Sequence, residues 1–286
     1  LETFLQAEIP SWWRGMWHSG DRGWDYTRSF CKKLGSNGWL TMAWPKEHGG
    51  ADAPIWTQVI FKEAMAKYGE PRGSQYMNLN WIGPSIMLFG SEEQKELYLS
   101  KISAGDVEWC QGFSEPDSGS DLASLQCRAE RDGDDFVING QKIWTSYARR
   151  AEYVFLLTRT DQDAPKHKGI SVFLIDMKTP GITIRTIKSM GGDVHLNEVF
   201  YDNVRVPRSC MLGEENQGWG VVTTALNFER IGQPRYQQAW WDLKRVMEYA
   251  KETHTDQRGA LSKDPVLRQR IADVYVRYRV ARALNY

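Results

Sequence analysis

The sequence predicts an α+β multidomain protein with a helical N-terminal domain, a middle antiparallel β-barrel or sandwich domain, and a C-terminal helical domain. Three observations lead to this prediction. Apolar residues recur at helical spacing over residues 1–106, β-rich runs separated by turn signals fill residues 107–212, and helical spacing returns over residues 213–286. The last predicted helix is still running at Tyr286, so we expect the C-terminal domain to be incomplete here.

The first helices are predicted from the spacing of their apolar residues. Phe30 and Leu34 stand four residues apart and precede Gly35, where the helix is expected to stop. The apolar face of the next predicted helix consists of Ile55, Val59, Ile60 and Met65. The segments 49–54 and 69–73 are rich in glycine and proline, so we expect loops there.

Cap and breaker residues mark the ends of further helices. Ser91 and Gln94 form the pattern of a capping box. One long helical pattern follows "GEENQGWG", and Pro234 should kink it or divide it. A final helix is expected to begin with Asp264 as its cap and Pro265 at its first position.

The middle of the chain carries the strands and two turn signals. The runs "YVFLLTRT", "GISVFLIDM", "GITIRTI" and "NEVFYDNVRVP" are rich in β-branched and aromatic residues. "DGDD" at 132–135 predicts a turn, and "NG" at 139–140 predicts a hairpin turn between "DFVI" and "QKIW".

Composition excludes several classes of protein. Lys and Arg together number 36, as do Asp and Glu, and this balance argues against a nucleic-acid surface. No apolar run approaches the roughly 20 residues needed to span a bilayer, and the first residues lack the features of a signal peptide. The four cysteines have no metal-ligand spacing, so we expect reduced thiols, no metal site and a cytoplasmic protein.

Two stretches offer groups for binding a ligand. "GFSEPDSGSDLA", residues 112–123, follows a predicted strand and exposes backbone N–H groups and hydroxyls, so it is either a cradle for a polar ligand or an ordinary turn. It matches neither the P-loop nor the dinucleotide-binding fingerprint. In "NGQKIWTS", a Trp and two hydroxyl residues suit a planar heterocycle with polar edges. The alternative is a Trp in the core of the β-domain, followed by an ordinary strand Thr and Ser.

Together, "GFSEPDSGSDL" and "VINGQKIWTS" resemble the acyl-CoA dehydrogenase family of flavoproteins. "GWLTMAWPKEHGG", "FGSEEQKELYL", "NEVFYDNVRVP" and "GEENQGWG" occur in the same order as in that family, so the resemblance covers nearly all of the chain. It implies a helical N-terminal domain, a middle β-domain and a C-terminal four-helix bundle. It also implies non-covalent FAD, bound between the β-domain and the last helices and completed by a neighbouring subunit.

The resemblance also implies which residues bind. The expected cofactor-binding residues are Gln111, Phe113, Ser114, Gly119, Ser120, Trp144, Thr145 and Ser146. Phe113 and Ser114 would face the isoalloxazine, Trp144 would cover one flavin face, and Thr145 and Ser146 would bond to its edge. Ser120 would also bind the acyl-CoA substrate, together with Asn227 and Arg230.

The implied reaction is α,β-desaturation of an acyl-CoA, in which a carboxylate removes the α-proton and the β-hydrogen leaves as hydride to the flavin. Family members place this carboxylate either late in the last domain or directly before an Arg on the first long helix of that domain. "NFERIGQ" matches the second pattern, so Glu229 is the expected base, beside Arg230. From the residues alone, a solvated surface Glu is the alternative.

Two departures from the family pattern bear on substrate and assembly. Gly192, His195 and Asn197 replace the usual Arg and Ser/Thr residues, and "HLNEVF" resembles members that act on bulky, branched or steroid-derived acyl-CoAs. Thr253 and His254 stand where the family often has a contact to the FAD of the next subunit, so that contact is in doubt.

The expected function is therefore FAD-dependent acyl-CoA dehydrogenation, with electrons passed to an electron-transfer flavoprotein. An acyl-CoA oxidase-like enzyme and a non-catalytic partner subunit of a heteromer are the alternatives. The resemblance implies a homo- or heterotetramer, and we expect neither a nucleic acid nor a membrane as partner.

Overall fold

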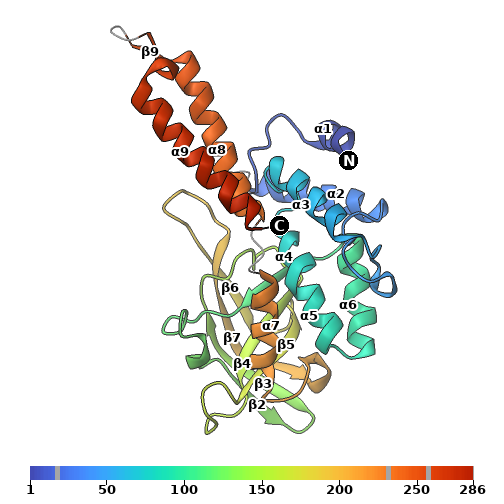
Figure 1. Cartoon of the computed structure of the whole chain (residues 1–286). Helices are drawn as coiled ribbons and strands as arrows, with labels where there is room; N and C mark the ends of the chain where they lie inside the picture. Colours follow the sequence, from blue (N-terminus) through green and yellow to red (C-terminus); the bar gives the residue numbers. More distant parts are fainter. Residues whose placement is uncertain (17–19, 230–232, 256–258, 286) are drawn as a thin grey trace. The chain divides into compact units, whose positions relative to one another are not determined.

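The computed structural model describes residues 1–16, 20–229, 233–255 and 259–285 (Figure 1). The chain forms two compact units. The sheet unit comprises Trp17–Ala53 and Arg72–Arg230. The helical unit comprises Leu1–Met16, Pro54–Pro71 and Ile231–Tyr286. Each unit therefore combines segments that are far apart in the sequence.

The sheet unit contains an eight-stranded sheet in the order β6-β7-β3-β2-β4-β5-β8, with β1 beside β4. The strands are β1 (Trp109–Gly112), β2 (Arg128–Asp132), β3 (Asp135–Lys142), β4 (Tyr153–Arg159), β5 (Ile170–Asp176), β6 (Ile182–Ile187), β7 (Leu196–Pro207) and β8 (Met211–Leu212). The predicted β-runs are thus confirmed. Most pairings are antiparallel, but β4 pairs in parallel with β1 and β2, so the sheet is mixed.

The two predicted turns have different outcomes. Gly133, with φ 65°, lies in the tight turn between β2 and β3, as the sequence predicts. The hairpin turn predicted at 139–140 is wrong, because both residues lie inside β3, where the register shifts between Ile138 and Gly140. A Cβ on Gly140 would lie 2.7 Å from the Cα of Cys127. The glycine therefore permits a bulge and a close approach of two backbones, not a chain reversal.

The core of the sheet unit is aromatic and rich in sulfur. Phe136 packs on Phe173 with ring centroids 5.2 Å apart, and Cys110 and Cys127 are buried beside them in the same cluster. All four cysteines lie among the described residues, and no disulfide joins them, as the sequence predicts. Burial raises the pKa of the Cys127 thiol to about 11, which keeps the sulfur protonated and unreactive at neutral pH.

The sheet unit also contains five α-helices among its described residues. They are α2 (Gly20–Ser36), α4 (Gln75–Met77), α5 (Gly83–Phe89), α6 (Glu92–Ala104) and α7 (Gly218–Glu229), with short 3₁₀ turns at Lys46–His48, Leu122–Ser124 and Arg208–Cys210 and a π-turn at Asn78–Ile82. The capping box of Ser91 and Gln94 is confirmed. Helix α2 continues through Gly35, where a Cβ would lie 2.7 Å from the carbonyl oxygen of Ser103. That glycine lets α2 approach α6 closely and does not end the helix.

The helical unit contains α1 (Glu2–Glu8), α3 (Ile55–Lys67), α8 (Gln233–Glu252) and α9 (Pro265–Ala283), with a small β-ribbon of β9 (His254–Thr255) and β10 (Gly259–Ala260) and a 3₁₀ turn at Leu261–Lys263. Helix α7 ends at Glu229 and α8 begins at Gln233, and residues 230–232, where the kink or division predicted at Pro234 would fall, lie outside the described residues. Asp264 caps α9 by accepting from the backbone N–H groups of Val266 and Leu267. Helix α9 ends at Ala283, so the expectation that it runs to the last residue is wrong.

The predicted apolar face of α3 is only half right. Val59 and Met65 are buried, as predicted, but Ile55 and Ile60 are exposed. The buried face continues instead through Phe61. The helical unit also contains a partly buried ion pair, in which the Arg282 guanidinium donates to both carboxylate oxygens of Glu63 at 2.7 and 2.8 Å. This pair ties α3 to α9.

A buried carboxyl at the entrance of β1 predicts a pH-dependent stability. Glu108 is buried, and burial raises its pKa to about 7, against the weaker effects of a Ser74 hydrogen bond and of Arg28. Its stabilising contribution is complete below the unfolded pKa of about 4.5 and is lost as the pH rises through about 7. A shift of this size corresponds to roughly 3 kcal/mol.

The Glu108→Gln variant should remove this dependence, because an amide stays neutral. We expect denaturant melts to show the parent losing stability relative to the variant between about pH 4.5 and pH 7, with the difference constant above that window. A stability difference that does not change across this window would show that Glu108 is not buried as a neutral acid.

Candidate functional site

The structure brings the two ligand-binding stretches of the sequence together. The loop after β1 and the end of β3 are joined by the backbone N–H of Ile143, which donates to the carbonyl oxygen of Ser114 at 2.8 Å. The ammonium of Lys142 donates to the carbonyl oxygen of Phe113 at 3.0 Å. Residues 111–115 and 142–146 therefore lie side by side, although about thirty positions separate them in the chain.

A buried ion pair fixes this junction. Lys142 is fully buried, and its Nζ donates to Oε1 of Glu115 at 2.7 Å. The same carboxylate accepts from the backbone N–H of Gln126 at 2.6 Å and of Cys127 at 2.9 Å. Buried charges are tolerated when they are paired and their remaining hydrogen bonds are made, and both conditions hold here. Sequence reasoning missed this pair, although Glu115 and Lys142 stand inside the two quoted motifs.

Trp144 is presented outward by an unusual backbone. The residue is 55% exposed and its φ is 59°, in the left-handed region. Tyr147, three residues later, has φ 66°. Such a conformation costs a non-glycine residue on the order of 1–3 kcal/mol and persists only where the surroundings enforce it. A large apolar ring held in this way provides a flat wall for a planar ligand.

Two buried polar groups on the two joined stretches lack a hydrogen-bond partner among the described residues. They are the hydroxyl of Thr145 and the side-chain amide nitrogen of Gln111. A buried donor without an acceptor costs about 1–3 kcal/mol, so native proteins rarely leave one unmatched. A ligand with acceptor atoms at its edge would supply a partner to the Thr145 hydroxyl, on the residue next to Trp144. The residues present therefore fit a flat heterocycle with polar edges.

The loop tip is open. Gly119 and Ser120 are exposed, and a Cβ on Gly119 would have no atom within 4 Å. The base of the loop is closed by Ser118, whose hydroxyl donates to the carbonyl oxygen of Asp121 at 3.0 Å. Phe113 and Ser114 are partly buried where the loop meets β3, and Ser146 is partly buried after Thr145. The predicted cofactor-binding residues thus lie on the two joined stretches.

The predicted catalytic and substrate residues lie on another element. Glu229 is the last residue of α7, and only its backbone is described. Asn227, two residues earlier, is exposed on the same helix, which packs on β5 and α5. Arg230 lies outside the described residues. The role of Glu229 as base stays a prediction.

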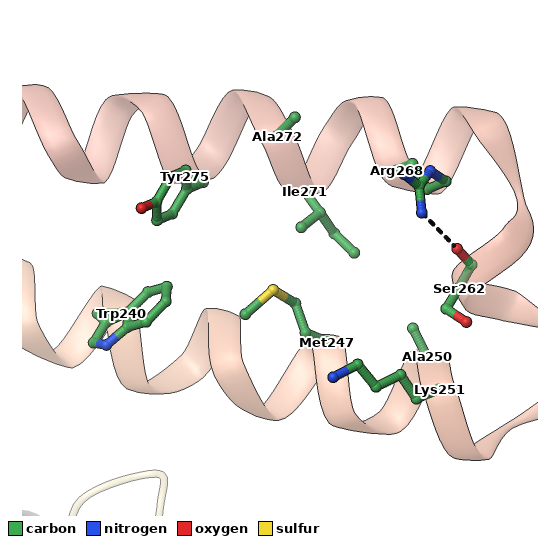
Figure 2. Close-up of a pocket in the computed structure, with 9 residues that line it drawn as sticks. All are labelled: Trp240, Met247, Ala250, Lys251, Ser262, Arg268, Ile271, Ala272 and Tyr275. Carbon is green, nitrogen blue, oxygen red and sulfur yellow. Dashed lines mark hydrogen bonds between the residues drawn. The ribbon is translucent and has the colours of Figure 1, made fainter.

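The structure also contains a pocket that is distinct from the candidate site. A pocket of about 430 Å³ lies between α8 and α9, with Trp240 and Tyr275 toward one end and Lys251 and Arg268 toward the other (Figure 2). It shares no residue with the predicted site.

No group of three potential metal ligands occurs in the described part of the chain, and none of the described helices is long and apolar enough to cross a membrane.

Three family models match the chain in order. They are described as "Acyl-CoA dehydrogenase, N-terminal domain" at residues 1–106, "middle domain" at residues 110–204 and "C-terminal domain" at residues 216–286. The middle-domain match includes both stretches of the candidate site. The matches therefore cover the site and most of the remaining chain.

Individual relatives carry the same family name as the matched models. "Acyl-CoA dehydrogenase FadE26" of Mycobacterium tuberculosis is 37% identical over 262 residues, which are 91% of this chain but 65% of the relative. The human "Short-chain specific acyl-CoA dehydrogenase, mitochondrial" is 33% identical over 263 residues, 89% of this chain and 63% of the relative. The chain thus spans somewhat less than two thirds of the length of these relatives.

Solved structures match over nearly the whole chain. "Tcur3481-Tcur3483 steroid ACAD" has a TM-score of 0.86 at 35% identity, covering 99% of this chain and 73% of the other. The "ChsE4-ChsE5 complex" from Mycobacterium tuberculosis has a TM-score of 0.88 at 34% identity, covering 99% and 72%. The helix–sheet–helix architecture is therefore shared with these structures.

Proposed function

Because this chain belongs to the acyl-CoA dehydrogenase family, we propose that the whole protein is an FAD-dependent enzyme that desaturates an acyl-CoA thioester between its α and β carbons. One observation in the chain itself carries the proposal. The exposed ring of Trp144 lies beside the unpartnered buried hydroxyl of Thr145, on a segment joined directly to the Gln111–Ser120 loop. That arrangement suits the flat, acceptor-edged ring system of a flavin.

FAD would supply the acceptor for the hydride that leaves the β-carbon. The residues of this chain would do the remaining work. Trp144 would cover one face of the ring, while Thr145, Gln111 and Ser146 would hydrogen-bond its edge. Ser120, Asn227 and Arg230 would hold the acyl-CoA. Glu229 would take the α-proton, and exclusion of water by Trp144 and Phe113 would strengthen every electrostatic contact at the thioester.

For the substrate, we propose a bulky acyl-CoA such as a steroid side-chain ester. Support comes from Gly192, His195 and Asn197, which depart from the commoner family pattern, and from the similar structure named "Tcur3481-Tcur3483 steroid ACAD". For partners, we propose assembly into a homo- or heterotetramer and electron transfer to an electron-transfer flavoprotein. One matched structure is named as the "ChsE4-ChsE5 complex", another has the two-part name "Tcur3481-Tcur3483 steroid ACAD", and an "Electron transferring flavoprotein" structure from Acidaminococcus fermentans also matches. We propose a cytoplasmic location because the four cysteines form no disulfide.

A single hydroxyl tests the cofactor proposal. The Thr145→Val variant removes a buried group that has no protein partner among the described residues, so the apoprotein should be as stable as the parent or more so. Binding of FAD should weaken, by about tenfold for the loss of one hydrogen bond. We expect flavin titration and thermal melts to show these opposite effects.

Thr158 provides the matched control. Its buried hydroxyl also lacks a partner among the described residues, but it lies on β4, outside the candidate site. The Thr158→Val variant should gain stability in the same way and bind FAD like the parent. Equal FAD affinity in both variants and the parent, or no FAD uptake by the full-length parent, would count against the proposed site.

A further inference from the structure

Asn197 on β7 is fully buried directly beneath the Trp144–Tyr147 segment. Its Nδ2 donates to the carbonyl oxygen of Thr145 at 3.0 Å and to the carbonyl oxygen of His195 at 2.9 Å. Its own backbone carbonyl accepts from the N–H of Thr145 at 3.0 Å. One residue thus holds Thr145 through both its N–H and its carbonyl group.

The chemistry of these contacts requires an asparagine. Two carbonyl oxygens need a group with two hydrogens, which the amide nitrogen supplies. The amide oxygen then accepts from the hydroxyl of Thr186 on β6 at 3.3 Å. Aspartate has no donor at neutral pH, serine and threonine have one, and glutamine is one methylene longer. The observed partners also fix the orientation of the amide.

These contacts act on the part of the chain that presents the candidate site. Trp144 and Tyr147 both have positive φ and flank Thr145 on either side. The N–H of Tyr147 donates at 2.7 Å to the carbonyl oxygen of His195, which is the second acceptor of the Asn197 amide. Asn197 therefore holds Thr145 directly and Tyr147 indirectly, through the carbonyl oxygen of His195 that its amide also binds.

We infer that Asn197 is a positioning residue: it holds the Trp144–Tyr147 segment in its left-handed conformation, so that the Trp144 ring and the Thr145 hydroxyl are aimed at the flavin. This inference rests on the proposed function for the identity of the ligand. The part of the inference that concerns structure, namely that Asn197 holds the segment in place, depends only on the observed hydrogen bonds. The two halves can be tested separately.

The Asn197→Ser variant of the full-length protein keeps one donor and is small enough for the site to accept it. We expect the amides of Thr145 and Tyr147 to exchange with deuterium roughly tenfold faster than in the parent, and FAD to bind roughly tenfold more weakly, as for the loss of one or two hydrogen bonds. Fluorescence of the bound flavin should also rise, because the Trp144 ring no longer lies against it.

Val204→Ala is the matched control, because Val204 is fully buried on the same strand and pairs with Ile138, away from the segment. It should lower global stability without changing exchange at residues 145–147 or FAD affinity. If Asn197→Ser matches this control in both exchange and flavin fluorescence, the inference is overturned. If the parent takes up no FAD, the proposed function fails, and the exchange rates still decide whether Asn197 holds the segment.

Discussion

The Glu229→Gln variant is expected to bind FAD and acyl-CoA like the parent and yet reduce its flavin about 10²–10⁴-fold more slowly, which is the usual effect of losing a general base. Glutamine keeps the volume and hydrogen-bonding capacity of the side chain while removing the proton acceptor. The α-proton of a thioester is only weakly acidic, so no solvent species can replace the carboxylate efficiently. Rapid mixing with acyl-CoA in the absence of oxygen measures this rate directly.

Glu96→Gln serves as the control. It makes the same chemical change at a residue that is exposed on α6. It should reduce its flavin at the parent rate. If Glu229→Gln does so too, Glu229 has only a structural role. The base would then have to come from a residue outside this chain's described part or from a partner subunit.

The Lys142→Met variant should lose about 3–5 kcal/mol of stability, because it leaves the Glu115 carboxylate buried without its cation. Methionine fills the space of the lysine stem, so the loss reports the charge and its hydrogen bonds. The double variant Glu115→Gln/Lys142→Met should recover part of the loss, because it leaves no unpaired charge buried. The recovery is not complete, because the N–H groups of Gln126 and Cys127 bond to different carboxylate oxygens and the single amide oxygen of glutamine can accept from only one of them. Denaturant unfolding of the parent, the single variants and the double variant measures the coupling energy.

Two outcomes would contradict this account of the junction. Lys142→Met could be as stable as the parent, which would mean that the ion pair is not desolvated. The double variant could lose the sum of the two single losses, which would mean that the two losses are independent. Lys95→Met is a suitable control, since Lys95 pairs with the exposed carboxylate of Glu92 and such surface pairs contribute at most about 1 kcal/mol.

Locally determined features of the fold were predictable from the sequence. The capping box at Ser91 and the Asp264 cap depend on residues within one helical turn, and both are present as predicted. The wrong predictions concern residues whose role depends on a segment that is distant in sequence. Gly35 and Gly140 are general breakers in sequence, but each is placed to let another backbone approach, from α6 and from Cys127. The residues next to Gly35 and Gly140 in the sequence do not indicate either of these close backbone contacts.

The candidate site was predictable in part. Motif resemblance pointed to the Gln111–Ser120 loop and to Trp144–Ser146, and the structure joins these stretches. The residues that join them were missed. Lys142 and Glu115 act through a pairing across 27 positions, and Asn197 acts across 52. Such roles depend on strand order and register, which single residues in sequence do not reveal. Glu229 was predicted from resemblance alone and remains to be tested.

The most direct test of the central claim is an anaerobic titration of the full-length, FAD-loaded protein with two acyl-CoAs, one with a steroid side chain and one with a butyryl chain. We predict that the steroid-type ester bleaches the visible flavin band and is converted to the α,β-unsaturated ester, two hydrogens lighter by mass, while the butyryl ester reacts far more slowly. A preference for the butyryl ester would overturn the substrate proposal only. A flavin band that neither ester changes, in protein fully loaded with FAD, would contradict the account as a whole.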